Sequence, residues 1–172
     1  MNQPRNSPWP SVISYSKMRR AIEILAAGDW LLEAAVGTVS LPFHNRYRRR
    51  IRLTDDTGED FLLDLVEPSR FRDGDGLVLD DGSILVVRAA SEAVLDIICK
   101  TAEKKTQIAW HLGNRHTAVQ ILPRGNLRIC QDHVLEKMVH GLGAATRRLT
   151  APFEPEGGAY EHSHTHNSGE KT

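Results

Sequence analysis

The segment Ala93-Val94-Leu95-Asp96-Ile97-Ile98, with residues 101–112 that follow it, decides the fold of this chain. The first part is a short, mostly apolar run of the kind that forms a buried strand. In the second part Thr101 is a plausible N-cap, and apolar residues recur at helical spacing. The expected inward face consists of Ala102, Ile108, Ala109 and Leu112. A strand followed directly by an amphipathic helix therefore begins the C-terminal half.

Working outward, the remainder of this half continues the same alternation. Strands are expected at 118–122, 127–130 and 147–150, with a turn at 123–126. Asp132 is expected to cap a second helix at 133–142, which Gly141 and Gly143 end. Its expected inward residues are Val134, Leu135, Met138 and Leu142. The order strand, helix, strand, strand, helix, strand predicts a ferredoxin-like βαββαβ domain.

The N-terminal half has a different pattern, with short alternating strands and turn residues about every ten positions between 36 and 90. This pattern predicts a small barrel or sandwich. Residues 18–35 are compatible with a helix or with a strand. The fold class is therefore α+β. We expect a small all-β domain at 1–90, a ferredoxin-like domain at 91–153 and a flexible, histidine-containing tail at 154–172.

Charge and composition exclude several classes of function. Lys plus Arg and Asp plus Glu each number 22, whereas a nucleic-acid-binding protein usually has a basic excess. No apolar run is long enough to span a membrane, and the N-terminus lacks the apolar stretch of a secretory signal. We therefore expect a cytoplasmic protein. The two cysteines, Cys99 and Cys130, are expected to be buried and reduced.

One basic cluster stands out in the N-terminal half, and it leaves two interpretations open. We favour a solvated strand edge. The alternative is a docking patch for an acidic protein surface. The cluster consists of Arg46, Arg48, Arg49, Arg50 and Arg52.

Histidine is the unevenly distributed residue, since seven of the eight lie after residue 110. Imidazole is a common ligand for nickel, zinc and copper(II). The clearest group is His162, His164 and His166, whose alternating spacing lets a flexible chain wrap one ion. Such a site would be weak, because ordering the tail costs roughly 1–2 kcal/mol per residue.

Three other histidines are weaker candidates on their own. His111 lies at a predicted helix C-terminus, where a cation is favoured in any case. His116 lies just past that helix. His133 lies in the first turn of the second predicted helix, where a cation opposes the helix dipole, so a neutral or metal-ligating imidazole fits better.

Several short segments occur in a fixed order over about seventy residues of the C-terminal half. They are Trp110-His111-Leu112-Gly113-Asn114-Arg115-His116, Gln120-Ile121, Asp132-His133-Val134-Leu135-Glu136, Leu142-Gly143-Ala144, Ala151-Pro152-Phe153-Glu154-Pro155-Glu156 and Gly158-Ala159-Tyr160. In these segments the chain resembles a known family, the urease accessory proteins that act as nickel metallochaperones.

The resemblance implies a peptide-binding-like β domain followed by a metal-binding, dimerising domain. It makes His116 the central nickel ligand, one copy from each subunit of a homodimer, with the tail histidines as further ligands. It implies a GTP-binding urease accessory protein and the urease apoprotein complex as partners. Some relatives carry a histidine one or two positions before the Asp-His pair, whereas this chain has Cys130 and Gln131. His133 therefore has fewer neighbouring ligands.

The function expected from all of this is a non-enzymatic metallochaperone that delivers Ni²⁺ for assembly of the urease active site by ligand exchange. Ligand type alone does not separate nickel from its neighbours, so Zn²⁺ and Cu²⁺ are expected to compete in vitro. One alternative is a protein-interaction module with incidental metal binding in the tail. The other is a metal-dependent hydrolase using His111, His116, Asp132 and His133, although no helical ligand motif supports it.

Overall fold

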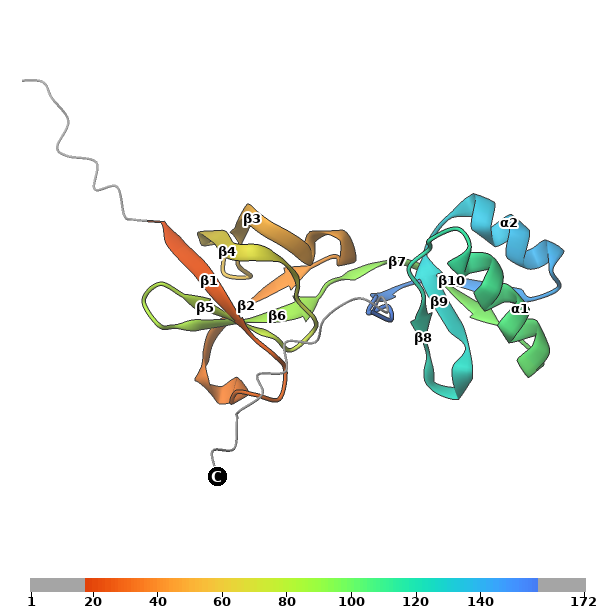
Figure 1. The fold of residues 1–172 in the computed structure, drawn as a ribbon, viewed down its shortest axis with the longest axis horizontal. Helices are drawn as coiled ribbons and strands as arrows, with labels where there is room; N and C mark the ends of the chain where they lie inside the picture. Colours follow the sequence, from red (N-terminus) through yellow and green to blue (C-terminus); the bar gives the residue numbers. More distant parts are fainter. Residues whose placement is uncertain (1–17, 158–172) are drawn as a thin grey trace, which may run out of the picture.

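The computed structural model describes residues 18–157, which form two lobes along one long axis (Figure 1). The strands up to Ala89 belong to a six-stranded sheet, and those from Ser91 onward belong to a four-stranded sheet. Each sheet has its own apolar core. The expected α+β class is confirmed, with a β domain followed by a domain in which helices cover a sheet.

The N-terminal sheet has the strand order β2-β6-β5-β1-β4-β3. Its strands are β1 (Arg19–Leu25), β2 (Ala35–Leu41), β3 (Tyr47–Thr54), β4 (Asp60–Arg70), β5 (Gly76–Leu79) and β6 (Ile84–Ala89). Short 3-10 turns, η1 (Leu32–Ala34) and η2 (Phe43–Asn45), flank β2. As the alternation predicts, Phe61, Leu63 and Leu65 of β4 are buried together.

The turn between β3 and β4 connects the two edges of this sheet. The backbone N–H of Asp56 donates to the carbonyl of Thr38 on the edge strand β2 (2.9 Å), and its carboxylate accepts from Ser40 N–H (3.0 Å). Neighbouring Asp55 is buried and accepts a hydrogen bond from Arg19 (2.7 Å). The predicted turn therefore also closes the sheet around its core.

Of the two alternatives for residues 18–35, the strand is right for β1, and no α-helix forms there. β1 lies inside the sheet, parallel to β4 and antiparallel to β5. Its β-branched Ile22 and Ile24 suit this position. Tertiary pairing outweighs the helical propensity of the segment.

The arginine cluster divides at Arg46. β3 is an edge strand, as expected, and Arg50 and Arg52 on it are largely exposed. Arg46 precedes β3 and is buried, with 1% of its surface exposed, so the expectation of a solvated side chain is wrong for this residue. Its partners are Glu154 and the carbonyl of Phe153, more than one hundred positions later in the chain.

The C-terminal sheet has the order β10-β7-β9-β8, and every neighbouring pair is antiparallel. Its elements are β7 (Ser91–Ile98), α1 (Ala102–Gly113), β8 (Gln120–Ile121), η3 (Pro123–Gly125), β9 (Leu127–Cys130), α2 (His133–Gly141) and β10 (Ala145–Pro152). This is the predicted ferredoxin-like order, in which the first strand lies between the third and the fourth. β8 is shorter and β10 longer than expected.

Both helices bury one face against this sheet. Thr101 and Asp132 cap them as predicted, and Ile108 and Leu112 of α1 are fully buried. On α2 the expected inward residue Val134 is 60% exposed, and Val139 is buried instead. The other expected residues, Leu135, Met138 and Leu142, do pack against the core, so the buried face of α2 includes Val139 in place of Val134.

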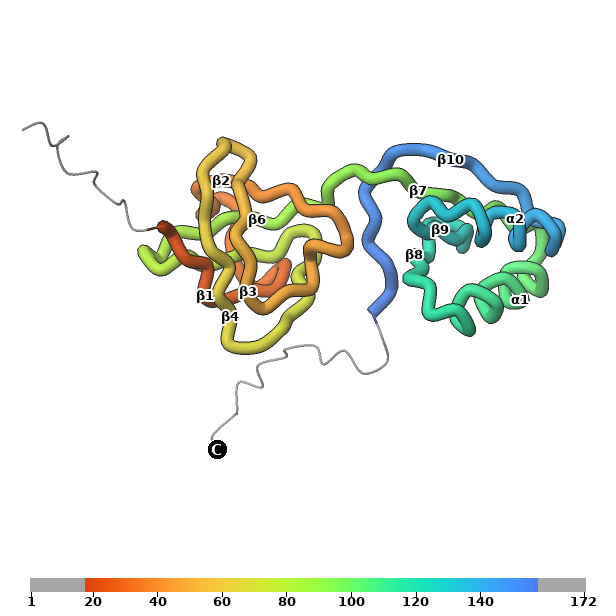
Figure 2. The backbone as a smooth tube through the Cα atoms, turned by 90° about the horizontal axis from the view of Figure 1, so that it is seen from above, coloured from red at the N-terminus to blue at the C-terminus, as the bar shows by residue number. Residues whose placement is uncertain are grey.

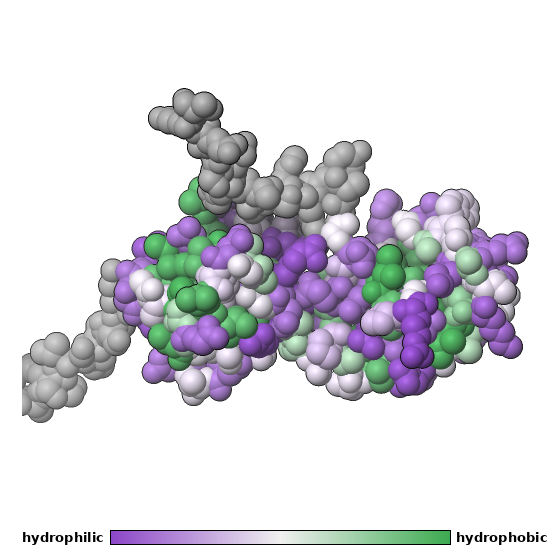
Figure 3. All heavy atoms as spheres, turned by 90° about the horizontal axis from the view of Figure 1, so that it is seen from below, coloured by the Kyte–Doolittle hydropathy of each residue, from purple (hydrophilic) through white to green (hydrophobic). Residues whose placement is uncertain are grey.

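The two lobes are joined through β7 and β10, which pair along their whole length (Figure 2). Hydrophobic side chains gather in separate patches on the two lobes, and mainly hydrophilic side chains lie between them on the face in Figure 3. No helix in the described part of the chain is long and apolar enough to cross a membrane.

Candidate metal centre

His116 lies at the C-terminal end of α1, where it takes part in ending the helix. Its backbone N–H donates to the carbonyl of Gly113 (2.9 Å), and Thr117 N–H reaches back to the carbonyl of Leu112 (3.2 Å). These are the two hydrogen bonds of a Schellman motif. His116 is the residue of that motif with positive φ (52°), a conformation that glycine adopts most easily.

The glycine at position 113 predicts that the helix ends at Gly113-Asn114, and α1 does end there, with Asn114 as its C-cap. Gly113 is the last helical residue, and its φ is not positive. The left-handed turn falls three residues later, on a histidine. Histidine is one of the non-glycine residues that tolerate this region, at some cost in strain.

The second helix ends in the same way with the usual residue. Gly143 has φ of 85° and donates to the carbonyl of His140 (2.9 Å), while Ala144 N–H reaches the carbonyl of Val139 (3.2 Å). Both helices of this domain therefore end in the same motif. Its left-handed position is occupied by Gly143 after α2 and by His116 after α1. The comparison isolates the histidine side chain as the difference.

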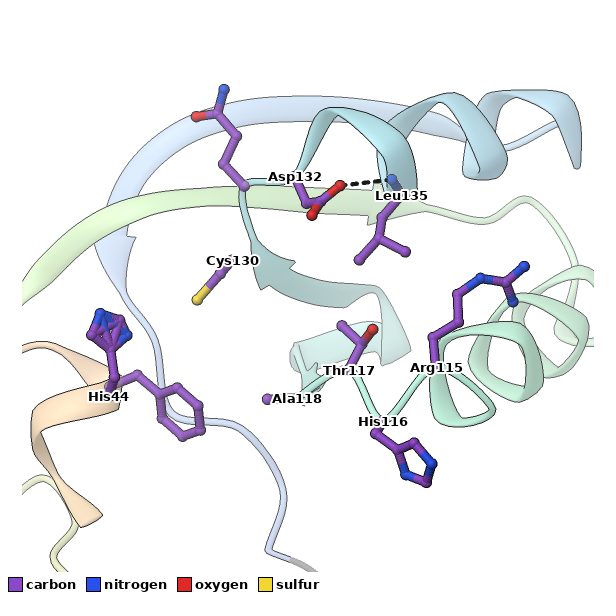
Figure 4. A pocket seen from close by; sticks show the side chains of 10 residues that line it. His44, Arg115, His116, Thr117, Ala118, Cys130, Asp132 and Leu135 are labelled. Carbon is purple, nitrogen blue, oxygen red and sulfur yellow. Dashed lines mark hydrogen bonds between the residues drawn. The ribbon is translucent and has the colours of Figure 1, made fainter. Parts of the chain in front are cut away.

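The His116 side chain is exposed and lies beside a pocket of about 420 Å³ at the junction of the lobes (Figure 4). The pocket is lined by two segments of the C-terminal lobe and by one loop of the N-terminal lobe. The lining residues are Phe43, His44, Arg115, His116, Thr117, Ala118, Cys130, Gln131, Asp132 and Leu135. The turn that carries His116 thus forms part of a junction between domains.

His44 is the residue that sequence reasoning missed here. It lies in η2 of the N-terminal lobe, directly after Pro42-Phe43, and it lines the same pocket as His116 (Figure 4). Nothing in the sequence near residue 44 indicates this placement, because the contact depends on how the lobes join.

The other predicted histidines of this domain lie apart from the pocket lining. His111 is half-buried in the last turn of α1, with its ring edge-on to Trp110 at 5.0 Å between centroids. His133 is the exposed first residue of α2. Asp132 before it accepts from Val134 N–H (2.7 Å) and Leu135 N–H (2.9 Å), and these bonds lower the pKa of its carboxyl. Asp132 is therefore occupied as a helix cap.

Cys130 has a chemically quiet environment. Its thiol lies 3.6 Å from a carboxylate oxygen of Glu92, to which it donates, while the other oxygen of Glu92 accepts from Phe43 N–H (2.8 Å). Burial, together with the Glu92 charge, raises the pKa of Cys130 to about 12. A protonated thiol is a poor metal ligand. Both cysteines are free and partly buried.

Within residues 18–157, no three His, Cys, Asp or Glu side chains come together in an arrangement that could hold a metal ion. His111, His116 and His133 are thus not assembled into one cluster by a single chain. The tail histidines His162, His164 and His166 lie outside the described residues. His116 therefore has no complete set of metal ligands around it within the described part of the chain.

Comparison with known proteins gives a consistent result across the chain. Two family models match: the N-terminal domain of the UreE urease accessory protein over residues 19–90, and its C-terminal domain over residues 92–172. A urease accessory protein UreE of Bradyrhizobium sp. (strain ORS 278) is 48% identical over 150 residues, which cover 87% of this chain and 70% of the relative.

Two further relatives carry the same name. The protein of Rhodopseudomonas palustris (strain BisB18) is 48% identical over 153 residues, covering 87% of this chain and 72% of its own. That of Rhodobacter capsulatus is 43% identical over 145 residues, covering 84% of this chain and 88% of its own. The likeness spans both lobes.

Proposed function

Since this chain belongs to the family of UreE urease accessory proteins, whose role is in the maturation of urease, we propose that it is a nickel metallochaperone. It binds Ni²⁺ as cargo and releases it for assembly of the urease active site. The chain's own residues supply the ligands, and delivery is an exchange of ligands with no chemical turnover. We assign no enzymatic activity to it.

The observation that carries this proposal is the histidine in the left-handed position that ends α1. Glycine at that position would relieve backbone strain, as Gly143 does at the end of α2. A strained residue points to a function for its side chain. The side chain of His116 is an exposed imidazole, which suits a borderline metal such as nickel.

One His116 underfills a nickel ion, so we propose a homodimer in which two copies meet across a twofold axis. Exposed apolar side chains on the segments around this turn support a protein interface there. They are Trp110 (63% exposed), Ile121 (57%) and Val134 (60%). His111 and His133, on the same segments, are candidates for auxiliary ligands.

The tail histidines His162, His164 and His166 complete the shell in this proposal. Ligands on a tail leave one at a time, which gives a recipient room to attack the metal. We propose a GTP-binding urease accessory protein and the urease apoprotein complex as recipients, in the cytoplasm. Zn²⁺ and Cu²⁺ compete for the same imidazoles in vitro.

The test is nickel calorimetry on wild type, His116→Ala, His116→Gly and a chain that ends after Tyr160. We expect both His116 variants to lose the tightest site and the shortened chain to bind more weakly than wild type. The His116→Gly variant keeps the helix end intact, so its loss of binding is due to the missing imidazole. Light scattering gives the oligomeric state of each variant with and without nickel.

Wild-type affinity in both His116 variants would remove the central site from the proposal. If shortening the tail alone abolished binding, the rival view of an interaction module with incidental tail binding would gain. Ester or amide hydrolysis that depended on His116 would instead favour the metal-dependent hydrolase.

A further inference from the structure

β3 forms an outer edge of the N-terminal sheet. It is the last strand in the sheet order and, among residues 18–157, it pairs only with β4. Figure 1 shows it at the periphery of the N-terminal lobe. An edge strand of this kind presents a row of backbone N–H and C=O groups that can pair with a further strand.

One part of this edge is regular enough to accept another strand. Between Arg48 and Arg50 the register with β4 shifts, so β3 is irregular at that point. From Arg50 to Thr54 each residue pairs in turn with β4, running from Asp64 back to Asp60. This stretch has the ordinary length of a strand in a globular protein. The part of β3 available for pairing is therefore its C-terminal part.

Arginine gives this edge its charge. β3 has four arginines, no lysine and no carboxylate, although acidic side chains outnumber basic ones in residues 18–90 as a whole. Basic residues that merely protect a sheet edge are most often lysines, whereas arginine is enriched in protein interfaces. The composition therefore favours a surface that binds a partner over one that only repels other strands.

The arginines of the regular part are only partly neutralised by neighbouring carboxylates. Arg50 and Arg52 are each 64% exposed, and Arg52 pairs with Asp60 (2.5 Å). Arg50 lies 3.4 Å from Asp64, but that carboxylate accepts its hydrogen bond from Arg20. The hydrogen bond from Arg20 lowers the pKa of Asp64, and the charge of Arg50 lowers it further. One carboxylate thus faces two arginines, which leaves a surplus of positive charge at Arg50.

Side chains alternate along the regular part of the edge. Arg50, Arg52 and Thr54 are exposed, whereas Leu53 belongs to the core and Ile51 packs against it. The side chains of a strand added beside β3 would follow the same alternation. Those next to the arginines would meet guanidinium groups, and those next to Ile51 and Leu53 would extend the apolar core. The edge therefore fits an extended segment in which carboxylate and apolar side chains alternate.

A second copy of this chain matches the same edge poorly. Two β3 strands placed side by side would bring the arginines of one copy close to those of the other. Like charges opposite each other in a sheet are destabilising, whereas opposite charges in the same positions are stabilising. The charge of the edge therefore selects a different, acidic chain.

We propose that the edge of β3 from Arg50 to Thr54 binds an extended acidic segment of another protein by strand addition, with carboxylates of that segment beside Arg50 and Arg52. In this mode of recognition, backbone hydrogen bonds give affinity and the side chains give specificity. The inference goes beyond the proposed function and does not depend on it, because β3 belongs to the lobe that does not carry His116.

The test uses the full chain without metal and a fluorescein-labelled octapeptide in which glutamate and valine alternate. We expect its fluorescence anisotropy to rise on binding, and to rise less at high salt, because salt screens the exposed charges. An octapeptide in which lysine and valine alternate should not bind. Hydrogen exchange of the β3 amides between Arg50 and Thr54 should become slower when the acidic peptide is bound.

The key variant is Arg50→Gln/Arg52→Gln, which removes both charges but keeps long polar side chains. We expect it to bind the acidic peptide about three- to tenfold more weakly than wild type, since two cross-strand charge pairs are lost. The matched control is Lys100→Gln/Lys137→Gln, which removes two exposed charges from the C-terminal lobe and should bind as wild type does. Circular dichroism should show both variants folded, because exposed ion pairs contribute little to stability.

A second acidic peptide separates strand addition from simple charge attraction. Replacing two of its valines by proline keeps the charge but removes N–H donors that strand pairing needs, so it should not bind. Equal binding of this peptide would overturn strand addition.

No rise in anisotropy with the glutamate–valine peptide would overturn the inference, as would an equal loss of affinity in the two double variants. Nickel affinity of Arg50→Gln/Arg52→Gln should equal that of wild type. A failure of this inference thus leaves the proposed function untouched, and the reverse also holds.

Discussion

The buried ion pair between Arg46 and Glu154 predicts an unusual order of mutational costs. The guanidinium is 1% exposed and the Glu154 side chain is 27% exposed. Removing Glu154 leaves a buried positive charge with only the Phe153 carbonyl as acceptor. Removing Arg46 takes the buried charge away and leaves a carboxylate with access to water. Truncation of Glu154, the more exposed partner, should therefore lower the free energy of unfolding more than truncation of Arg46 does.

The magnitudes follow from the burial. Breaking a fully buried pair by deleting one partner costs about 3–5 kcal/mol, and partial screening of Glu154 reduces this to about 2–3 kcal/mol for Glu154→Ala. Arg46→Met keeps most of the volume and loses the hydrogen bond to Phe153 and the contact over the Phe43 ring, which is 5.9 Å away. That costs about 1–2 kcal/mol.

The assay is urea unfolding followed by tryptophan fluorescence and circular dichroism. The loss of stability in Glu154→Ala corresponds to a thermal unfolding midpoint about 5–10 °C below that of wild type. The matched control is Arg52→Met, since Arg52 is 64% exposed and pairs with Asp60 at the surface, where such pairs contribute little. A larger cost for Arg46→Met than for Glu154→Ala would refute the charge-burial argument and favour packing.

Three further predictions concern single residues. Burial alone would raise the pKa of Asp96, but hydrogen bonds from Arg128 and Arg147 lower it overall. Ionised Asp96 therefore stabilises the fold at pH values above the ordinary pKa of 3.8, and this stabilisation is lost as the pH falls through the lower pKa of the folded state. The urea midpoint of Asp96→Asn should therefore vary less with pH below about 4 than that of wild type. His116→Gly should be about 1 kcal/mol more stable than His116→Ala, because only glycine adopts positive φ without strain, and denaturation curves without metal check this. Cys130, with its pKa raised to about 12, should react slowly with a thiol reagent at pH 8 until urea unfolds the protein.

The C-terminal domain could be predicted because its signals are local. Thr101 and Asp132 cap helices through hydrogen bonds to residues two or three positions away. The spacing of Ile108 and Leu112 marks the buried face of α1 without knowledge of its partners. The order of strands and helices then leaves few topologies.

The features that escaped prediction depend on contacts between distant segments. Arg46 resembles its arginine neighbours in sequence, and only Glu154 and Phe153 distinguish it. His44 joins the pocket only through the junction of the lobes. The positive φ of His116 is a local feature, but the nearby Gly113 gave a more plausible helix stop. The candidate site was therefore found by its histidine motif, whereas its surroundings needed the structure.

The incomplete ligand set within residues 18–157 is consistent with the proposed role. A metal held by three or four fixed side chains in a buried pocket would leave slowly. Here the fixed element is one exposed imidazole on a helix end, and nothing else within residues 18–157 forms a metal-holding group with it. In the proposed function the remaining ligands come from a second subunit and from His162, His164 and His166, so no single lobe holds the whole ligand set.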